Sequence, residues 1–136
     1  MDFEKLKAFR QNCSRFTERM GITVEEIRPG YSRVSKSIGE DDLNPIGRAH
    51  GGVYFTLADH AAGTAMATCG YLAVTVNATY NYFRSANPGD QLTAEAQEVK
   101  AGKTLCVFDV RVTDQNGALL GSGTFTFYRL EEKLDL

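Results

Sequence analysis

The chain has little of three things that would narrow its function at once: cysteine, proline and an excess of charge of one sign. Its cysteines, Cys13, Cys69 and Cys106, are odd in number and widely spaced, which favours a reducing cytoplasm over a disulfide framework. Three prolines, 43% hydrophobic and 24% charged residues are typical of a globular chain. The formal net charge of −2 argues against a general nucleic-acid binder, which would normally be basic.

Long apolar runs are also missing from the 136 residues. No segment has the length and hydrophobicity of a transmembrane helix, and the first residues, MDFEKLKAFR, lack the apolar core of a signal peptide. Two histidines without clustered cysteines or carboxylates predict no metal site. The length suits one domain spanning 1–136, without linker or repeat. We therefore expect a cytoplasmic protein with neither a membrane nor a nucleic acid as partner.

The first part of the chain predicts a helix, a hairpin and a loop. Apolar side chains recur at steps of three and four residues over 2–20, which predicts one amphipathic helix ending at Gly21 with the charged residues between them on its polar side. Residues 22–38 predict a strand or hairpin interrupted at Pro29-Gly30. Residues 39–49 have little periodicity and predict a loop.

A second helix and four strands follow. His50-Gly51-Gly52 leads into VYFTLADHAAGTAMATCG, a helix whose many small side chains suit a buried position close to a sheet. Residues 72–84 alternate, which predicts a strand with its apolar residues on one face and Thr75 on the polar face. Further strands are predicted at residues 91–99, 104–113 and 118–129, with turns at Asn87-Pro88-Gly89-Asp90, Gly102-Lys103 and Asp114-Gln115-Asn116-Gly117.

This order of elements predicts an α+β fold. Consecutive strands with short connections favour an antiparallel sheet, and a single central helix can cover one face of it. We therefore expect the sheet to wrap around the second helix. The other face of the sheet and the polar face of strand 72–84 would still need cover, which favours dimerisation.

Most of the chemical information lies in NPIGRAHGGVYFTLADHA. Gly51 and Gly52 leave backbone N–H groups unobstructed at the positive end of a helix dipole, which is a natural cradle for a polarised carbonyl oxygen. Asp59, two turns further on, lies among alanines, where a carboxylate is costly to bury. On these residues alone, Asp59 is either catalytic or a structural residue bonded to a partner or to water, and His60 is a structural or surface histidine.

The same stretch resembles the PaaI-type branch of the hotdog-fold acyl-CoA thioesterases, whose motif is Asn…His-Gly-Gly followed by an Asp on the central helix. The strand VTVNATYNYFRSANPGD also resembles the family's strand that leads to its CoA-contacting turn. The resemblance implies the hotdog fold and hydrolysis of an acyl-CoA to free acid and CoA without a cofactor. It also implies a homodimer or homotetramer with the sites at the subunit interface.

The resemblance also implies roles for individual residues. Asp59 would be the general base that activates water, or the nucleophile, and the Gly51 N–H would polarise the thioester carbonyl. Asn44 and His50 would shape the site and hold the loop, and Thr75 would position the water. Arg84 and Lys103 are either contacts for CoA phosphates or solvated surface charges. The full set of substrate-binding candidates is Gly52, Arg84, Lys103, Tyr82 and Phe83.

Two other functions compete with thioester hydrolysis. A hotdog hydroxyacyl-thioester dehydratase would need a catalytic histidine paired with an acid, whereas His50 belongs to the His-Gly-Gly loop. A non-catalytic acyl-CoA-binding module would have no use for a buried acid at Asp59. Both alternatives are therefore less favoured than hydrolysis.

Overall fold

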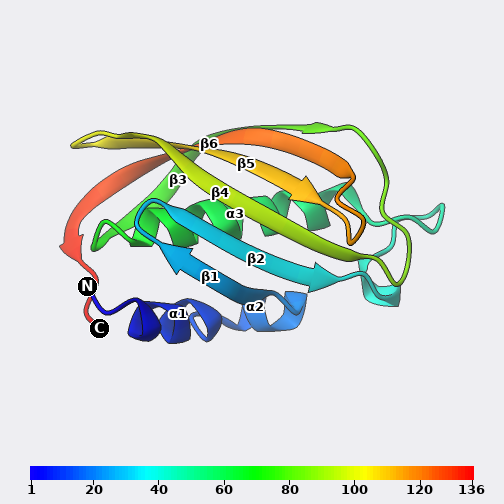
Figure 1. The fold of residues 1–136 in the computed structure, drawn as a ribbon, viewed down its shortest axis with the longest axis horizontal. Coiled ribbons are helices and arrows are strands. Elements are labelled where there is room, and N and C mark those ends of the chain that lie inside the picture. The colour runs from blue at the N-terminus through cyan, green and yellow to red at the C-terminus, as the bar shows by residue number, and fades with distance from the viewer.

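The fold is a six-stranded antiparallel sheet curved around one long helix, in a computed structural model that describes residues 1–136 (Figure 1). The strand order is β1-β2-β4-β5-β6-β3. The strands are β1 (Thr23–Arg28), β2 (Tyr31–Ser37), β3 (Tyr71–Tyr82), β4 (Gln91–Ala101), β5 (Leu105–Thr113) and β6 (Leu119–Lys133). The helices are α1 (Phe3–Gln11), α2 (Arg15–Met20), the short 3₁₀ helix η1 (Glu40–Asp42) and α3 (Gly51–Ala67). The predicted α+β class, with the sheet around a central helix, is confirmed.

The core lies between α3 and the concave face of the sheet. Leu57, Ala58, Ala61 and Ala62 of α3 are fully buried. Their small side chains let the helix approach the strands closely, so that bulky residues of the sheet fill the space around it. These sheet residues include Val34, Leu92, Phe108 and Phe125. None of the helices has both the length and the hydropathy needed to cross a bilayer.

The predicted single helix over 2–20 is wrong, because the chain forms two helices there. Ser14 interrupts it: its side chain caps α2 by accepting a hydrogen bond from the Thr17 N–H at 3.1 Å. The apolar stripe predicted over 2–20 is therefore not continuous from α1 to α2. Only Leu6 of α1 and Thr17 of α2 are buried. The predicted stop is confirmed, since Gly21 ends α2 in the left-handed conformation with a φ of 69°.

Strand β3 is confirmed, but its predicted faces are wrong. A bulge lies at Val76, because Thr75 pairs with Phe127 whereas Asn77 pairs with Thr126. The extra residue shifts the alternation by one position, so side chains before and after it exchange faces. Thr75 therefore points towards α3, and Val76 is 52% exposed.

The hairpin of β1 and β2 and the later strands are confirmed, with some ends displaced. Strand β6 continues to Lys133, four residues beyond the predicted end. There it pairs with the start of β3, and Arg129 and Lys133 lie over the ring of Tyr71 at 4.3 and 6.0 Å. Helix α3 starts at Gly51, so the two glycines belong to its first turn.

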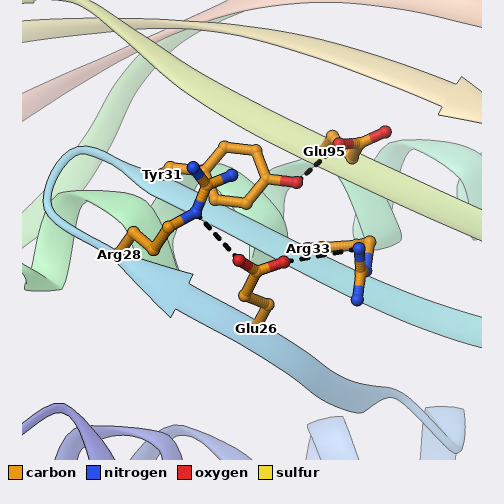
Figure 2. Close-up of polar contacts among 5 residues, drawn as sticks. All are labelled: Glu26, Arg28, Tyr31, Arg33 and Glu95. Carbon is orange, nitrogen blue, oxygen red and sulfur yellow. Dashed lines mark hydrogen bonds and ion pairs between the residues drawn. The ribbon is translucent and has the colours of Figure 1, made fainter.

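The outer face of the sheet is divided into a charged half and an apolar half. On β1 and β2, Glu26 joins Arg28 and Arg33 at 2.9 and 3.3 Å, and the Tyr31 hydroxyl donates to Glu95 at 2.5 Å (Figure 2). The other half, over β3, β5 and β6, exposes Val74, Leu105 and Tyr128, which are aligned in register across the three strands. This apolar row lies beside the free edge of the sheet at β3.

Candidate active site

The start of α3 presents one backbone donor without a partner. His50 caps the helix, and its Nδ1 accepts a hydrogen bond from the Gly52 N–H at 2.9 Å. The Gly51 carbonyl accepts from the Tyr82 hydroxyl at 2.8 Å, but the Gly51 N–H has no acceptor within the chain. This N–H lies at the positive end of the α3 dipole, where it can donate to a carbonyl or carboxylate oxygen.

The loop before α3 is held by its own polar groups. The Asn44 side-chain oxygen accepts hydrogen bonds from the N–H groups of Ile46 and Arg48, each at 3.0 Å. The His50 N–H donates to the Asp42 carbonyl at 2.8 Å. Asn44 is thus turned into its own loop, where it fixes the path of the chain towards Gly51.

Asp59 and Thr75 meet in a cavity of about 420 Å³. The Thr75 hydroxyl donates to the Asp59 carboxylate at 2.8 Å, so the bulge in β3 and the third turn of α3 together form this pair. The sequence placed the two residues sixteen positions apart without showing that they touch. Apolar side chains of α1, α2, α3, β3 and β6, and Ile22 just before β1, line much of the cavity. Those of the named elements include Phe9, Phe16, Met66, Ala73 and Phe127.

The environment changes the affinity of Asp59 for protons. Burial raises the pKa of this carboxyl above its usual value, while the hydrogen bond from Thr75 and the positive charge of Arg10 act in the opposite direction. The net result is a carboxylate that binds a proton more readily than a solvated aspartate does. A base of this kind, next to a hydroxyl and in an apolar cavity, is suited to take a proton from water beside a polarised carbonyl.

Arg10 is a residue of this cavity that the sequence pattern missed. Its Nε donates to the Thr64 hydroxyl at 3.0 Å, and its Nη2 lies 3.4 Å from His60 Nδ1. The prediction that Arg10 lies on the polar side of its helix is therefore wrong. Its spacing of four residues from the fully buried Leu6 was the available signal, because such residues share a helix face.

His60 is buried beside Asp59 and is electrically neutral. Only 9% of its surface is exposed. Burial, followed by the positive charge of Arg10, lowers the pKa of His60 to about 4. Because an arginine can only donate, the hydrogen-bond network assigns Nδ1 as acceptor and Nε2 as the protonated nitrogen, which has no partner. The structural alternative for His60 is thus favoured over the surface one.

Gly51 and Asp59 open into different pockets of the chain. The Gly51 pocket has a volume of about 290 Å³ and is lined by Tyr82, Phe83 and Arg84, among others. Asp59 lies eight positions after Gly51 in α3, which corresponds to about 12 Å along the helix axis. Within one chain Gly51 is therefore not brought together with Asp59 and Thr75.

The two candidate phosphate contacts are also far apart. Arg84 lies beside the Gly51 pocket, at the end of β3 where Tyr82 pairs with Gly121. Lys103 belongs to the turn before β5, which starts at Leu105 opposite Tyr128, and Tyr128 pairs in turn with Val74. The two basic residues thus lie towards opposite ends of the sheet. No group of three or more His, Cys, Asp and Glu side chains lies close enough together to hold a metal ion.

The chain matches one protein family over more than half its length. The sequence pattern of the thioesterase superfamily matches residues 46–120, which include both Gly51 and Asp59. The chain is similar to the acyl-coenzyme A thioesterase PaaI of Escherichia coli, with 33% identity over 71% of this chain and 69% of that protein. Acyl-coenzyme A thioesterase 13 of Homo sapiens is 31% identical over 77% of each chain.

Solved structures agree with these sequence matches. The E. coli PaaI protein from the phenylacetic acid degradation operon covers 98% of this chain and 96% of its own, with a TM-score of 0.92 and 26% identity. A hypothetical thioesterase of Streptococcus pneumoniae, solved with coenzyme A, has a TM-score of 0.80 and 33% identity over 83% of this chain and 88% of its own. Two further structures of that protein carry alanine in place of an aspartate and of a threonine sixteen residues later. The chain therefore belongs to the thioesterase superfamily, as a PaaI-type hotdog-fold thioester hydrolase.

Proposed function

We propose that the chain hydrolyses an acyl-CoA to a free acid and CoA, with Asp59 as the catalytic carboxylate. The observation that carries the proposal is the Asp59–Thr75 pair, held at 2.8 Å in a largely apolar cavity of about 420 Å³. The separation of these two residues equals that of the aspartate and threonine replaced in the streptococcal thioesterase. The coenzyme A in another structure of that relative supports CoA as the carrier.

The chemistry requires one base and one oxyanion donor. Asp59 takes a proton from water that Thr75 helps to position, the hydroxyl oxygen attacks the thioester carbon, and the carbonyl oxygen becomes an oxyanion that a Gly51 N–H stabilises. The C–S bond then breaks, and the CoA sulfur takes up the proton. In the nucleophilic route the same carboxylate attacks the carbon directly, and water hydrolyses the resulting anhydride.

We also propose that a complete site needs two copies of the chain. Gly51 and Asp59 lie about 12 Å apart along α3 and face different pockets, so a second subunit would supply the missing donor. Strand β3 is an unpaired edge with Val74 and Val76 half exposed, which is the kind of edge that pairs with another chain. The assembly would be a homodimer or homotetramer of 1–136 domains, and the three free cysteines support a cytoplasmic location.

For the CoA moiety, we propose the pocket at Gly51 as the point of contact. Tyr82 and Phe83 line this pocket, and Arg84 offers a charge for a phosphate. Gly52 does not line it; its N–H is bonded to the His50 side chain, and Gly52 contributes only by following Gly51 at the start of α3. Lys103 lies too far along the sheet to serve the same pocket of its own chain, so it could reach a phosphate only across an interface.

The competing dehydratase reading gains no support from the histidines. The His50 Nδ1 is occupied by the Gly52 N–H, and His60 contacts Arg10 rather than a carboxylate. The experiment that tests hydrolysis is a thiol-release assay across short, long and aromatic acyl-CoAs. We expect CoA release in proportion to enzyme for at least one class, whereas stoichiometric binding without release would favour the binding module.

A further inference from the structure

The Arg10 guanidinium is a cation in the Asp59 cavity that has no anionic partner in contact. Its hydrogen-bonding contacts are the Thr64 hydroxyl and the His60 ring, and both are neutral. The three ion pairs of the chain join other residues, so no carboxylate oxygen lies within 4.0 Å of Arg10. Its Nη1 makes no hydrogen bond within the chain and is not among the fully buried unpartnered atoms, so it is partly exposed, and Arg10 is one of the residues that line the cavity.

The position of the guanidinium is fixed by packing. A Cβ atom added to Gly63 would lie 3.3 Å from Arg10 Nη2, so the missing side chain of Gly63 makes room for it. Phe127 is the other neighbour of Gly63 at this place. A desolvated cation without a matching anion is costly. Burial indeed lowers the pKa of Arg10, although an arginine stays charged at neutral pH.

Asp59 interacts with the Arg10 guanidinium only through long-range electrostatic attraction. It contributes attraction to Arg10, but its carboxylate lies beyond ion-pair distance and is bound by Thr75 instead. The contacts of the guanidinium extend from His60 to Thr64, which places it within about 8 Å of Asp59 along the helix axis. An acyl group whose thioester carbon lies at Asp59 would therefore bring its far end to Arg10 after a short chain.

We propose that Arg10 binds a carboxylate at the far end of the acyl group, and that the substrates are ω-carboxyacyl-CoA thioesters with chains of about four to six carbons. A carboxylate would accept hydrogen bonds from two N–H groups of the guanidinium and supply the missing negative charge. The apolar lining of the cavity would hold the methylene groups between the two ends. The inference rests on the proposed acyl-CoA hydrolysis, whose site it extends.

The test compares substrates that differ only at the far end. For the wild type we expect kcat/KM for glutaryl-CoA to exceed that for pentanoyl-CoA by roughly tenfold or more, as one charge-assisted pair allows. Arg10→Met should lower this ratio by roughly 10- to 100-fold. Arg10→Lys keeps the positive charge but cannot donate two parallel hydrogen bonds to a carboxylate, so it should keep part of the preference. Arg15→Met removes an exposed arginine outside the cavity and should leave the ratio unchanged.

Binding gives a second readout that does not depend on hydrolysis. In Asp59→Asn, calorimetric titration should show tighter binding of glutaryl-CoA than of pentanoyl-CoA, and adding Arg10→Met should abolish the difference. If no acyl-CoA is hydrolysed but this Arg10-dependent preference persists, the proposed function fails and the inference stands. Equal affinities in Asp59→Asn, or an equal loss for both substrates in Arg10→Met, would overturn the inference while leaving hydrolysis intact.

Discussion

The hydrogen bond from Thr75 adjusts the proton affinity of Asp59, and this gives a pH-dependent prediction. A base must be deprotonated, so kcat/KM should fall on the acid side as pH drops through the raised pKa of Asp59. Thr75→Val removes a contact that lowers this pKa. We therefore expect the acid limb of the pH–rate profile to move to higher pH, with a smaller loss of kcat than replacement of Asp59 causes. An acid limb that stays in place would show that Thr75 does not interact with the catalytic carboxyl.

His60 gives a stability prediction of defined sign. Its pKa of about 4 in the folded chain lies below the ordinary histidine value of 6.5, so the unfolded chain binds the proton first as pH falls. The free energy of unfolding should drop between pH 6.5 and 4, by up to about 3 kcal/mol. In urea titrations, the free energy of unfolding of His60→Asn should drop less over the same pH interval. Asp59, whose pKa is raised, acts with the opposite sign, but it is present in both proteins.

At the scale of residues, the sequence indicated candidate catalytic groups but did not show which side chains contact them. Asp59 and Gly51 could be singled out from the sequence. Asp59 is a carboxylate among alanines, and Gly51 is a glycine at the start of a predicted helix. The contact between Arg10 and His60 could not be predicted, because α1 and α3 are distant in sequence. Which side of α1 faces α3 depends on how the two helices pack. Only the resemblance to a family indicated a role for Thr75. The predicted alternation of the strand had placed its side chain on the polar face, away from the helix.

At the scale of elements, a buried ion pair connects β2 to the loop that leads to Gly51. Lys36 and Asp42 meet at 3.0 Å with side chains only 6% and 12% exposed, and Lys36 also donates to the Met20 carbonyl at the end of α2. Lys36→Met would leave the Asp42 carboxylate without its cation, at a cost of about 3 kcal/mol in the free energy of unfolding. Arg33→Met, which breaks the exposed pair with Glu26, should cost less than about 1 kcal/mol. Equal losses in denaturant titrations would contradict this ranking.

The elements themselves were largely predictable, and their irregularities were not. Alternation located β3, β5 and β6, and turn signals such as Pro29-Gly30 and Asn116-Gly117 bounded the strands. The bulge at Val76 could not be predicted from the sequence, because the alternation of apolar and polar residues in 72–84 continues unbroken across it. The break before Ser14 had a signal, a serine three residues ahead of Thr17, but the apolar periodicity across it was the stronger pattern.

At the scale of the whole molecule, the free edge at β3 predicts self-association. Thr75 is exposed next to Val74 and Val76, and the outer apolar row of Val74, Leu105 and Tyr128 adjoins this edge. We expect light scattering to give at least the dimer mass for active protein. A mass near the 15.0 kDa of one chain, with full activity, would contradict both the assembly and a site shared between subunits.

The proposed mechanism depends on one carboxylate, and Asp59→Asn tests it most directly. The change keeps the size and the hydrogen bond to Thr75 but removes the base. In a thiol-release assay with the best acyl-CoA of the panel, we predict that kcat falls at least roughly a hundredfold, while circular dichroism and the oligomer mass stay those of the wild type. Activity close to wild type in a folded Asp59→Asn oligomer would contradict the proposed mechanism.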